Sequence, residues 1–169
     1  MRVTLDADQK TQTMTATAQM KGPDASGTAT FTEYDVDGWK YVHVHLSMNG
    51  LAPGRHAVHI HEKAACDCDG FKCAGGHFDP GPNGNTDPDA NHGWHAGDLP
   101  MITIGEDGSG ELEAITTRVT LSPGPVSIID QPEGTSLMIH GNPDPYTPGE
   151  TGSGHSGGPR LACGTIQAR

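Results

Sequence analysis

The stretch "TATFTEYDVDGWKYVHVHLSM", residues 28–48, decides how this chain folds. Residues 28–36 and 40–48 each alternate apolar and polar side chains, which is the pattern of a strand with one buried and one exposed face. At their junction stands DVDGW, residues 35–39, whose Asp and Gly residues are typical of a tight turn. The stretch therefore predicts an antiparallel hairpin.

The same period of two continues on both sides of this hairpin. Thr and Ala alternate in residues 11–20, and further strands are predicted at residues 56–62, 126–130 and 135–141, with a hairpin around EDGSG inside residues 99–121. No stretch sustains the apolar period of a helix. About seven or eight strands at this spacing indicate an all-β fold, either a β-sandwich or a barrel.

Length and composition limit the possible architectures and partners. A chain of 169 residues predicts one domain over residues 1–169, in which residues 1–10 could form a loose N-terminal arm. The net charge of −11 argues against binding to nucleic acid or to an anionic membrane surface. The sequence has neither an apolar run long enough to cross a bilayer nor a hydrophobic signal core at its N-terminus. We therefore expect a soluble protein without nucleic-acid or membrane partners.

Two long segments, residues 63–98 and 141–160, interrupt the strand pattern. Long loops without regular structure in a compact domain are usually either functional or disordered. The first segment holds most of the histidines and cysteines, so we expect function there.

Two His-x-His pairs occur in predicted strands. His59 and His61 alternate with a core residue, so both imidazoles point to the same face of the strand. An isolated pair of this kind is more often a solvated surface than a metal site. His43 and His45 have the same spacing but no other ligand-type residues nearby, and we assign them to a solvent-facing strand surface.

The first pair differs because other metal-binding residue types accompany it along the chain. They are His77, His95, Asp98 and His140. Imidazole suits copper and zinc, and a carboxylate added to imidazoles suits zinc. The sequence therefore predicts a metal centre that includes His59 and His61.

At these residues the sequence resembles the copper-zinc superoxide dismutases, most closely their bacterial exported branch, over roughly residues 28–169. The motifs that carry the resemblance stand in the family's order: GLAPGRHAVHIHEK, AGGHFDP, HAGDLP, MIHGNPD and GGPRLACGTI. The resemblance implies a Greek-key β-sandwich or barrel of about eight antiparallel strands with two long functional loops. It also implies an oxidoreductase that converts superoxide to dioxygen and hydrogen peroxide at a redox-cycling copper centre beside a zinc site.

The resemblance also implies the ligands of both metals. The implied copper ligands are His59, His61, His77 and His140. The implied zinc ligands are His77, His95 and Asp98. His77 would bridge the two metals as an imidazolate and would take up and deliver a proton during turnover.

Three further residues have implied roles around the metals. His56 would be a hydrogen-bonding support beneath the site. Asp144 would link a copper histidine to a zinc histidine and fix both tautomers. Arg160, just before LAC, would attract and orient an anion beside the copper, which matters on a chain of net charge −11.

One implied zinc ligand is missing from its usual place. Where the family has a second zinc histidine, this sequence has Asn85, and His92 is the only spare histidine in the loop. His92 could replace the missing ligand. The alternatives are a weakened or three-ligand zinc site and a copper-only enzyme.

The four cysteines alone allow three full pairings. The resemblance implies a disulfide between Cys66 and Cys163. Cys68 and Cys73 are then left over, and we expect them to form a second disulfide. The competing reading is that CDCDGFKC binds a soft metal through thiolates, which needs reduced cysteines. The disulfides and the resemblance predict a periplasmic or extracellular location.

Two other functional classes stay open at this stage. The first is a dismutase-like protein that binds or buffers copper without significant turnover. The second is a structural sandwich domain with vestigial ligands, which would predict missing copper ligands. Superoxide is the expected substrate, and the resemblance suggests a homodimer without fixing the oligomeric state.

Overall fold

The computed structural model describes residues 10–81, 84–90 and 94–169, and this part of the chain forms eight β-strands. Residues 1–9 of the expected N-terminal arm lie outside the described residues, while Lys10 already belongs to the first strand. The strands are β1 (Lys10–Lys21), β2 (Ser26–Val36), β3 (Trp39–Asn49), β4 (Gly54–His61), β5 (Asp98–Ile104), β6 (Gly110–Thr116), β7 (Ser136–His140) and β8 (Arg160–Ala168). Within this part, no helix is both long and apolar enough to cross a membrane.

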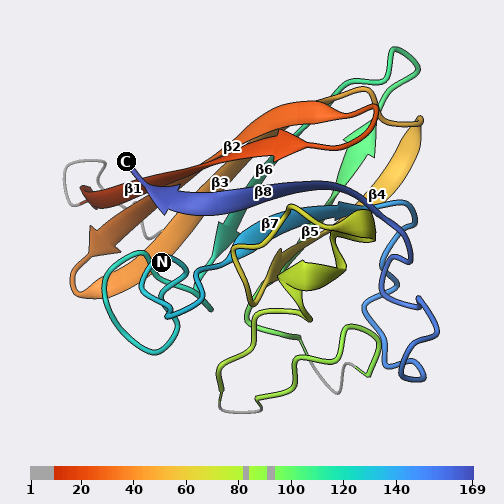
Figure 1. Ribbon diagram of the computed structural model, residues 1–169. Coiled ribbons are helices and arrows are strands. Elements are labelled where there is room, and N and C mark those ends of the chain that lie inside the picture. The colour runs from red at the N-terminus through yellow and green to blue at the C-terminus, as the bar shows by residue number, and fades with distance from the viewer. Residues whose placement is uncertain (1–9, 82–83, 91–93) are drawn as a thin grey trace, which may run out of the picture.

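The strands form one antiparallel sheet in the order β5-β4-β7-β8-β1-β2-β3-β6 (Figure 1). The two outermost strands, β5 and β6, follow one another in the chain and contact each other across a turn in which Gly105 N donates to Ser109 O at 2.9 Å. The sheet is therefore a nearly closed barrel. The pairs β3/β6 and β4/β7 are not consecutive in the chain, which is the connectivity of a Greek key. The predicted all-β fold class is confirmed.

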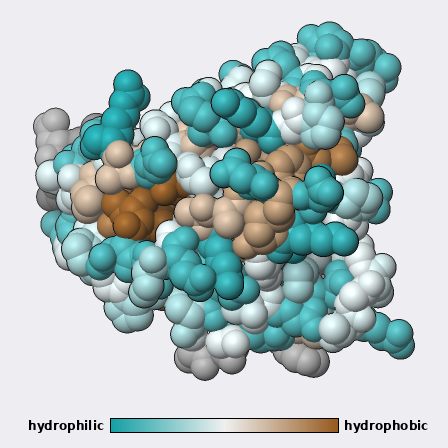
Figure 2. All heavy atoms as spheres, in the orientation of Figure 1, coloured by the Kyte–Doolittle hydropathy of each residue, from teal (hydrophilic) through white to brown (hydrophobic). Residues whose placement is uncertain are grey.

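The hairpin of residues 28–48 forms as predicted. β2 and β3 pair in register from Ser26 opposite Asn49 to Val36 opposite Trp39. Phe31 of β2 is fully buried, as is Leu46 of β3, while the polar residues of both strands, with the exception of Glu33, point outward. The apolar faces of the strands fill the barrel interior, and the outer face seen in Figure 2 is largely hydrophilic, with smaller apolar areas.

The predicted strand at residues 126–130 is wrong. Only Ser127 makes a bridge, an isolated parallel one with Thr120. Ile128 is buried, which explains the apolar pattern, but its backbone is satisfied locally: its N–H donates to Thr120 O at 2.9 Å and its carbonyl accepts from Thr135 Oγ1 at 2.5 Å. Since these groups are already bonded, the segment packs against the core as a loop instead of extending the sheet.

One carboxylate breaks the apolar pattern of the interior. Glu33 of β2 is fully buried and accepts hydrogen bonds from Thr13 Oγ1 (2.6 Å), from the backbone N–H groups of Leu121 (2.7 Å) and Ser122 (2.9 Å), and from Ser122 Oγ. Burial alone would raise the pKa of Glu33, but these hydrogen bonds outweigh it and lower the pKa to about 2. The ionised carboxylate therefore ties the loop after β6 to β2.

Replacing Glu33 with glutamine is expected to destabilise the fold by about 2 kcal/mol at neutral pH, because the amide turns a donor toward groups that need an acceptor. The folded pKa of about 2 lies below the ordinary glutamate pKa of 4.5, so the stabilisation is fully present above pH 4.5 and is lost as the pH falls toward the folded pKa. Urea unfolding of the metal-free proteins at neutral pH and near pH 3 measures their free energies of unfolding. The difference between wild type and variant should be smaller near pH 3. Glu113→Gln, at an exposed position of β6, is the matched control. A difference in unfolding free energy that does not change with pH would contradict the stabilising role of the ionised Glu33 carboxylate.

Candidate metal centre

Two clusters of buried metal-binding side chains lie at one end of β4, where the long loops cover the barrel. In each cluster the possible ligand atoms all lie within 4.8 Å of one another. The first cluster contains His59, His61, His77 and His140, and the second contains His77, His95 and Asp98. The structure thus brings together the predicted residues in these two sets, whereas His92 lies outside the described residues.

Strand pairing explains why residues so distant in sequence meet. In the antiparallel register, His59 of β4 stands opposite Asp98 of β5. His61, at the end of β4, makes an isolated bridge with His77. β7 pairs with β4 on its other edge and ends at His140, so the clusters form where three strands and a loop converge.

In the first cluster, each of three imidazoles has one ring nitrogen bonded to an oxygen of the protein. His59 Nε2 lies 2.7 Å from Asp144 Oδ2, His61 Nδ1 3.0 Å from Gly75 O, and His140 Nδ1 3.2 Å from Gly158 O. The nitrogens left over are His59 Nδ1, which has no hydrogen-bond partner among the described residues, and the Nε2 atoms of His61 and His140, which lie 3.4 Å apart. Buried nitrogens left uncommitted in this way suit a metal ion.

The second cluster shares His77 with the first. His77 Nδ1 lies 3.0 Å from Asp98 Oδ1 and 3.0 Å from His95 Nδ1, and His95 Nδ1 lies 3.4 Å from Asp98 Oδ2. The opposite nitrogen, His77 Nε2, is buried and has no hydrogen-bond partner within the described ranges. One imidazole therefore offers Nδ1 to the second cluster and Nε2 to the first.

Burial and mutual repulsion keep three imidazoles of the first cluster in the neutral form that binds metals. Burial, followed by the neighbouring His77, lowers the pKa values of His59 and His61 well below the usual range, and the same causes lower the pKa of His140 to about 3. In Asp98, burial would raise the pKa, but hydrogen bonds from His77 and His95 outweigh it and lower the pKa. Neutral imidazoles and an ionised carboxylate are the species that metals bind.

The two predicted supporting residues make different contacts. His56 Nδ1 lies 2.7 Å from His140 O, and His56 Nε2 lies 2.7 Å from Ala52 O. His56 therefore contacts the backbone at the end of β7 and supports the position of His140. Asp144 bonds His59 and accepts from Tyr146 N at 2.7 Å. Among the residues that the structure describes, it reaches no second histidine. The resemblance implied that Asp144 links a copper histidine to a zinc histidine. The structure shows the contact with His59 and, among the described residues, no contact with a zinc histidine.

The position of the missing zinc histidine is occupied by a residue that braces its own loop. Asn85 donates from its amide nitrogen to Ala90 O and accepts from Asp87 N at 3.1 Å. Its backbone N–H donates to Asp79 Oδ2 at 3.0 Å. These bonds hold the loop but leave the second cluster with three ligand residues in the described part of the chain.

Further contacts join the loop of residues 63–98 to the loop of residues 141–160, and sequence reasoning missed them. The buried carboxylate of Asp89 accepts from the backbone N–H groups of Gly154 (2.9 Å) and Ser156 (3.1 Å). Trp94, beside His95, stacks on Tyr146 with ring centroids 4.4 Å apart. In the sequence these residues look like ordinary loop residues, because nothing in it shows which loops meet.

An open pocket of about 530 Å³ leads to the first cluster, and both His140 and Arg160 line it. The guanidinium of Arg160 donates to Phe71 O (2.8 Å) and Gly75 O (2.7 Å). A second cationic side chain, Lys72, also lines this pocket, together with the carboxylate of Asp89. Two cations and one carboxylate thus line the entrance on a chain with an overall charge of −11.

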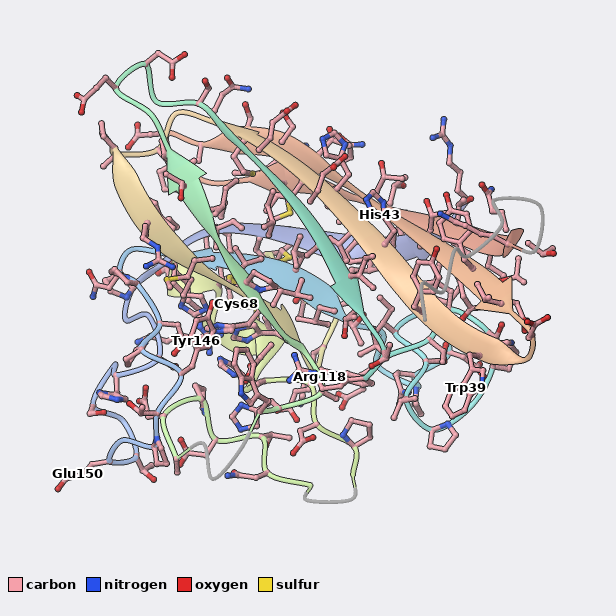
Figure 3. The ribbon with its side chains drawn as sticks, turned by 180° about the vertical axis from the view of Figure 1, so that it is seen from behind. Trp39, His43, Cys68, Arg118, Tyr146 and Glu150 are labelled. Atoms are coloured by element: carbon pink, nitrogen blue, oxygen red, sulfur yellow. A yellow bond between two sulfur atoms is a disulfide. The ribbon has the colours of Figure 1, made fainter. Side chains whose placement is uncertain are left out.

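All four cysteines are paired, as Cys66–Cys163 and Cys68–Cys73. CDCDGFKC therefore offers no thiolate in this structure, and the soft-metal reading of it is wrong for the oxidised chain. His43 and His45 lie on the outer side of β3, outside both clusters; Figure 3 shows His43 well away from Tyr146, the residue that bonds Asp144.

Comparison with known proteins gives a consistent result. The family model described as "Copper/zinc superoxide dismutase (SODC)" matches residues 25–166. The chain is 42% identical to the superoxide dismutase [Cu-Zn] of Deinococcus radiodurans over 85% of this chain and 78% of that protein. It is 36% identical to the one of Caulobacter vibrioides over 90% and 85%. The crystal structure of a SOD-like protein from Bacillus subtilis superposes with a TM-score of 0.71 at 29% identity, covering 92% of this chain and 99% of that one.

Proposed function

The chain belongs to the copper/zinc superoxide dismutase family, and from this premise we propose how its own residues dismutate superoxide. The copper ligands are His59, His61, His77 and His140. What supports this set is that hydrogen bonds commit one ring nitrogen of each imidazole and leave the other buried and available. A copper ion held by these residues would supply the one-electron redox chemistry by which two superoxide anions and two protons become dioxygen and hydrogen peroxide.

In this proposal His77 holds and moves a proton. Its Nδ1 stays with His95 and Asp98, whose carboxylate lies 3.0 Å away and fixes the ring. Its Nε2 is the nitrogen without a partner among the described residues, so it is the atom that takes up a proton and passes it to the reduced substrate. Asp144 keeps the His59 ring in one tautomer through its contact with Nε2.

Zinc would be held by His77, His95 and Asp98, a set of two imidazoles and a carboxylate that suits this ion. Structural zinc sites normally have four ligands, so a fourth position stays open in the described part of the chain. His92 as the fourth ligand stays a prediction. A weak zinc site should disturb stability and pH tolerance before it abolishes turnover, because its role is to fix the orientation of His77.

Arg160 attracts and orients the anion at the pocket entrance. Replacing Arg160 with alanine is expected to lower kcat/KM for superoxide roughly tenfold and to flatten its dependence on ionic strength, because one of the cations that line the pocket is gone. Pulse radiolysis at several salt concentrations measures both effects.

The matched control for this prediction removes the same charge elsewhere. Arg55 lies exposed on β4 and does not line the pocket, so Arg55→Ala should change kcat/KM far less than Arg160→Ala. Equal losses in the two variants would show that net charge, and not the position of Arg160, controls the rate.

The function itself is tested by loading the chain with copper and zinc, measuring bound metal, and following superoxide decay. Catalysed decay in proportion to bound copper is the expected result. Stoichiometric copper without catalysed decay would instead support a copper-binding or copper-buffering protein.

We place the chain in the periplasm or outside the cell, because its two disulfides persist in an oxidising compartment. Thiol mapping of the protein isolated from its native compartment tests this placement. The homodimer stays a prediction that sedimentation of the metal-loaded chain can test.

A further inference from the structure

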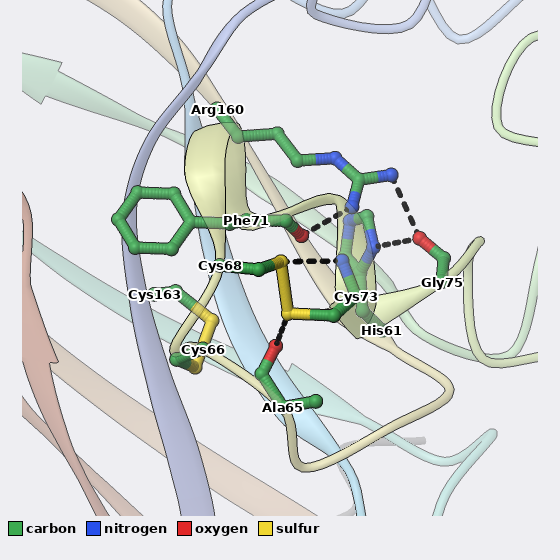
Figure 4. Close-up of a disulfide and its surroundings, with 9 residues drawn as sticks. All are labelled: His61, Ala65, Cys66, Cys68, Phe71, Cys73, Gly75, Arg160 and Cys163. Atoms are coloured by element: carbon green, nitrogen blue, oxygen red, sulfur yellow. Dashed lines mark hydrogen bonds between the residues drawn. A yellow bond between two sulfur atoms is a disulfide. The ribbon is translucent and has the colours of Figure 1, made fainter.

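The segment between the two metal histidines His61 and His77 carries a disulfide that the resemblance does not account for. Cys68 and Cys73 close a short loop with a sequence separation of 5, next to the Cys66–Cys163 bond that joins the same segment to β8 (Figure 4). We infer that the Cys68–Cys73 disulfide positions Arg160, by holding this loop in the shape that presents two carbonyl oxygens to its guanidinium. The inference rests on the proposed role of Arg160 as the cation that receives the anion.

The first step is that this loop supplies the hydrogen bonds of Arg160. The loop contains the short 3₁₀ segment η2 (Asp69–Ala74). One acceptor of Arg160, Phe71 O, lies inside the disulfide-closed loop, and the other, Gly75 O, follows directly after η2. Gly75 O also lies 3.0 Å from His61 Nδ1 (Figure 4). A single turn thus orients both the guanidinium and an imidazole of the first cluster.

The second step is that this turn needs a constraint. Gly70 and Phe71 have positive φ angles of 63° and 54°. Glycine adopts this left-handed conformation readily, but phenylalanine does so only when the surrounding structure enforces it. If Phe71 relaxed to a negative φ, the peptide plane would rotate and its carbonyl oxygen would leave Arg160.

The third step is that the disulfide encloses these two residues. It joins the residues on either side of the left-handed pair, and Phe71 N donates to Cys68 O at 2.9 Å across the same turn. Cys73 N lies 2.9 Å from Cys68 Sγ, and Cys73 Sγ lies 3.2 Å from Ala65 O. The bond therefore restricts the part of the chain whose relaxation would release Arg160.

A second support limits the expected size of the effect. The ring of Phe71 packs against a small cluster that includes Met138 and the Cys66–Cys163 disulfide. Loss of the Cys68–Cys73 bond should therefore loosen the turn without unfolding it. Arg160 should then sample positions away from the pocket instead of losing its place altogether.

The decisive variant is the full chain with both Cys68→Ser and Cys73→Ser. The first measurement is NMR of the arginine side chains in the metal-free protein, with the Arg160 signals assigned through Arg160→Lys. In wild type the guanidinium protons of Arg160 should be slowly exchanging, because two carbonyls hold them. In the double variant they should exchange at rates close to those of exposed arginines. Asp69→Ser, which alters an exposed side chain of the same turn and keeps the disulfide, is the matched control.

The second measurement is azide titration of the copper-loaded proteins, followed by the copper absorption bands. The double variant should bind azide roughly threefold to tenfold more weakly than wild type. In an Arg160→Ala background, loss of the disulfide should weaken azide binding by less than about a further twofold, because both changes act through the guanidinium of Arg160.

Unchanged Arg160 signals in the double variant would overturn the inference, and so would an equal loss of azide affinity with and without Arg160. If the double variant does not fold, the same spectra are recorded on wild type after mild reduction by a dithiol. The dithiol gives two electrons and two protons to the exposed Cys68–Cys73 bond and becomes a disulfide itself, and mass mapping verifies that Cys66–Cys163 is intact. Copper-loaded wild type without dismutation would refute the proposed function, while the metal-free spectra still decide the positioning role.

Discussion

Replacing His61 with alanine is expected to lower dismutation by more than about a hundredfold and to reduce bound copper, since losing even a supporting residue of a metal site typically costs about ten- to a hundredfold. The side chain is fully buried, its Nδ1 is committed to Gly75 O, and its Nε2 lies 3.4 Å from that of His140. Alanine would remove one ligand and leave a buried void. Metal analysis after dialysis, together with superoxide decay, measures both losses.

The chain provides a matched control for this prediction. His45 is also the second histidine of a His-x-His pair on a strand, but it lies half-exposed on β3, where its Nε2 is 3.6 Å from Glu111 Oε1. His45→Ala should keep copper content and activity near wild type. If both variants kept copper and activity, His61 would not be a ligand. If both lost them, the loss would come from the barrel and not from the site.

The two His-x-His pairs also show how much of the site could be predicted from sequence. Alternation placed His43 and His45 on one face of β3, and His59 and His61 on one face of β4. The structure agrees, since the first two are both partly exposed and the second two meet in one cluster. Spacing alone could not distinguish the two pairs. Only the motifs around His77, His95 and His140 indicated which pair meets other ligands, because convergence depends on strand order and not on local pattern.

The contacts that sequence reasoning missed are made by backbone atoms or between loops. The carbonyls of Phe71 and Gly75 hold Arg160, yet a carbonyl is common to all residues and leaves no mark in the sequence. Asp89 looks like one of several aspartates in a polar loop, but it is buried against the loop of residues 141–160. The false strand at residues 126–130 has the same origin, since its apolar residues pack inward while its backbone bonds locally.

Removing the Cys66–Cys163 disulfide is expected to have the largest effect on stability of any change considered for this chain. The bond closes a loop with a sequence separation of 97, and the chain-entropy model gives up to about 4.7 kcal/mol for a loop of about that length. For a protein of this size that corresponds to a fall in Tm of about 10 °C or more. Calorimetry of the metal-free Cys66→Ser and Cys163→Ser double variant measures it without interference from metal loss.

The Cys68–Cys73 bond is the natural comparison, because it closes a loop with a sequence separation of only 5. The same model gives about 2 kcal/mol for so short a loop, so its removal should lower the Tm by less than half as much. The two disulfides then have separate roles: the long-range bond fixes the metal loop to β8, and the short one shapes the turn that faces Arg160. Equal losses of stability would mean that loop length does not govern the contribution of either bond, and a Cys66 and Cys163 variant as stable as wild type would mean that other contacts hold the loop on β8.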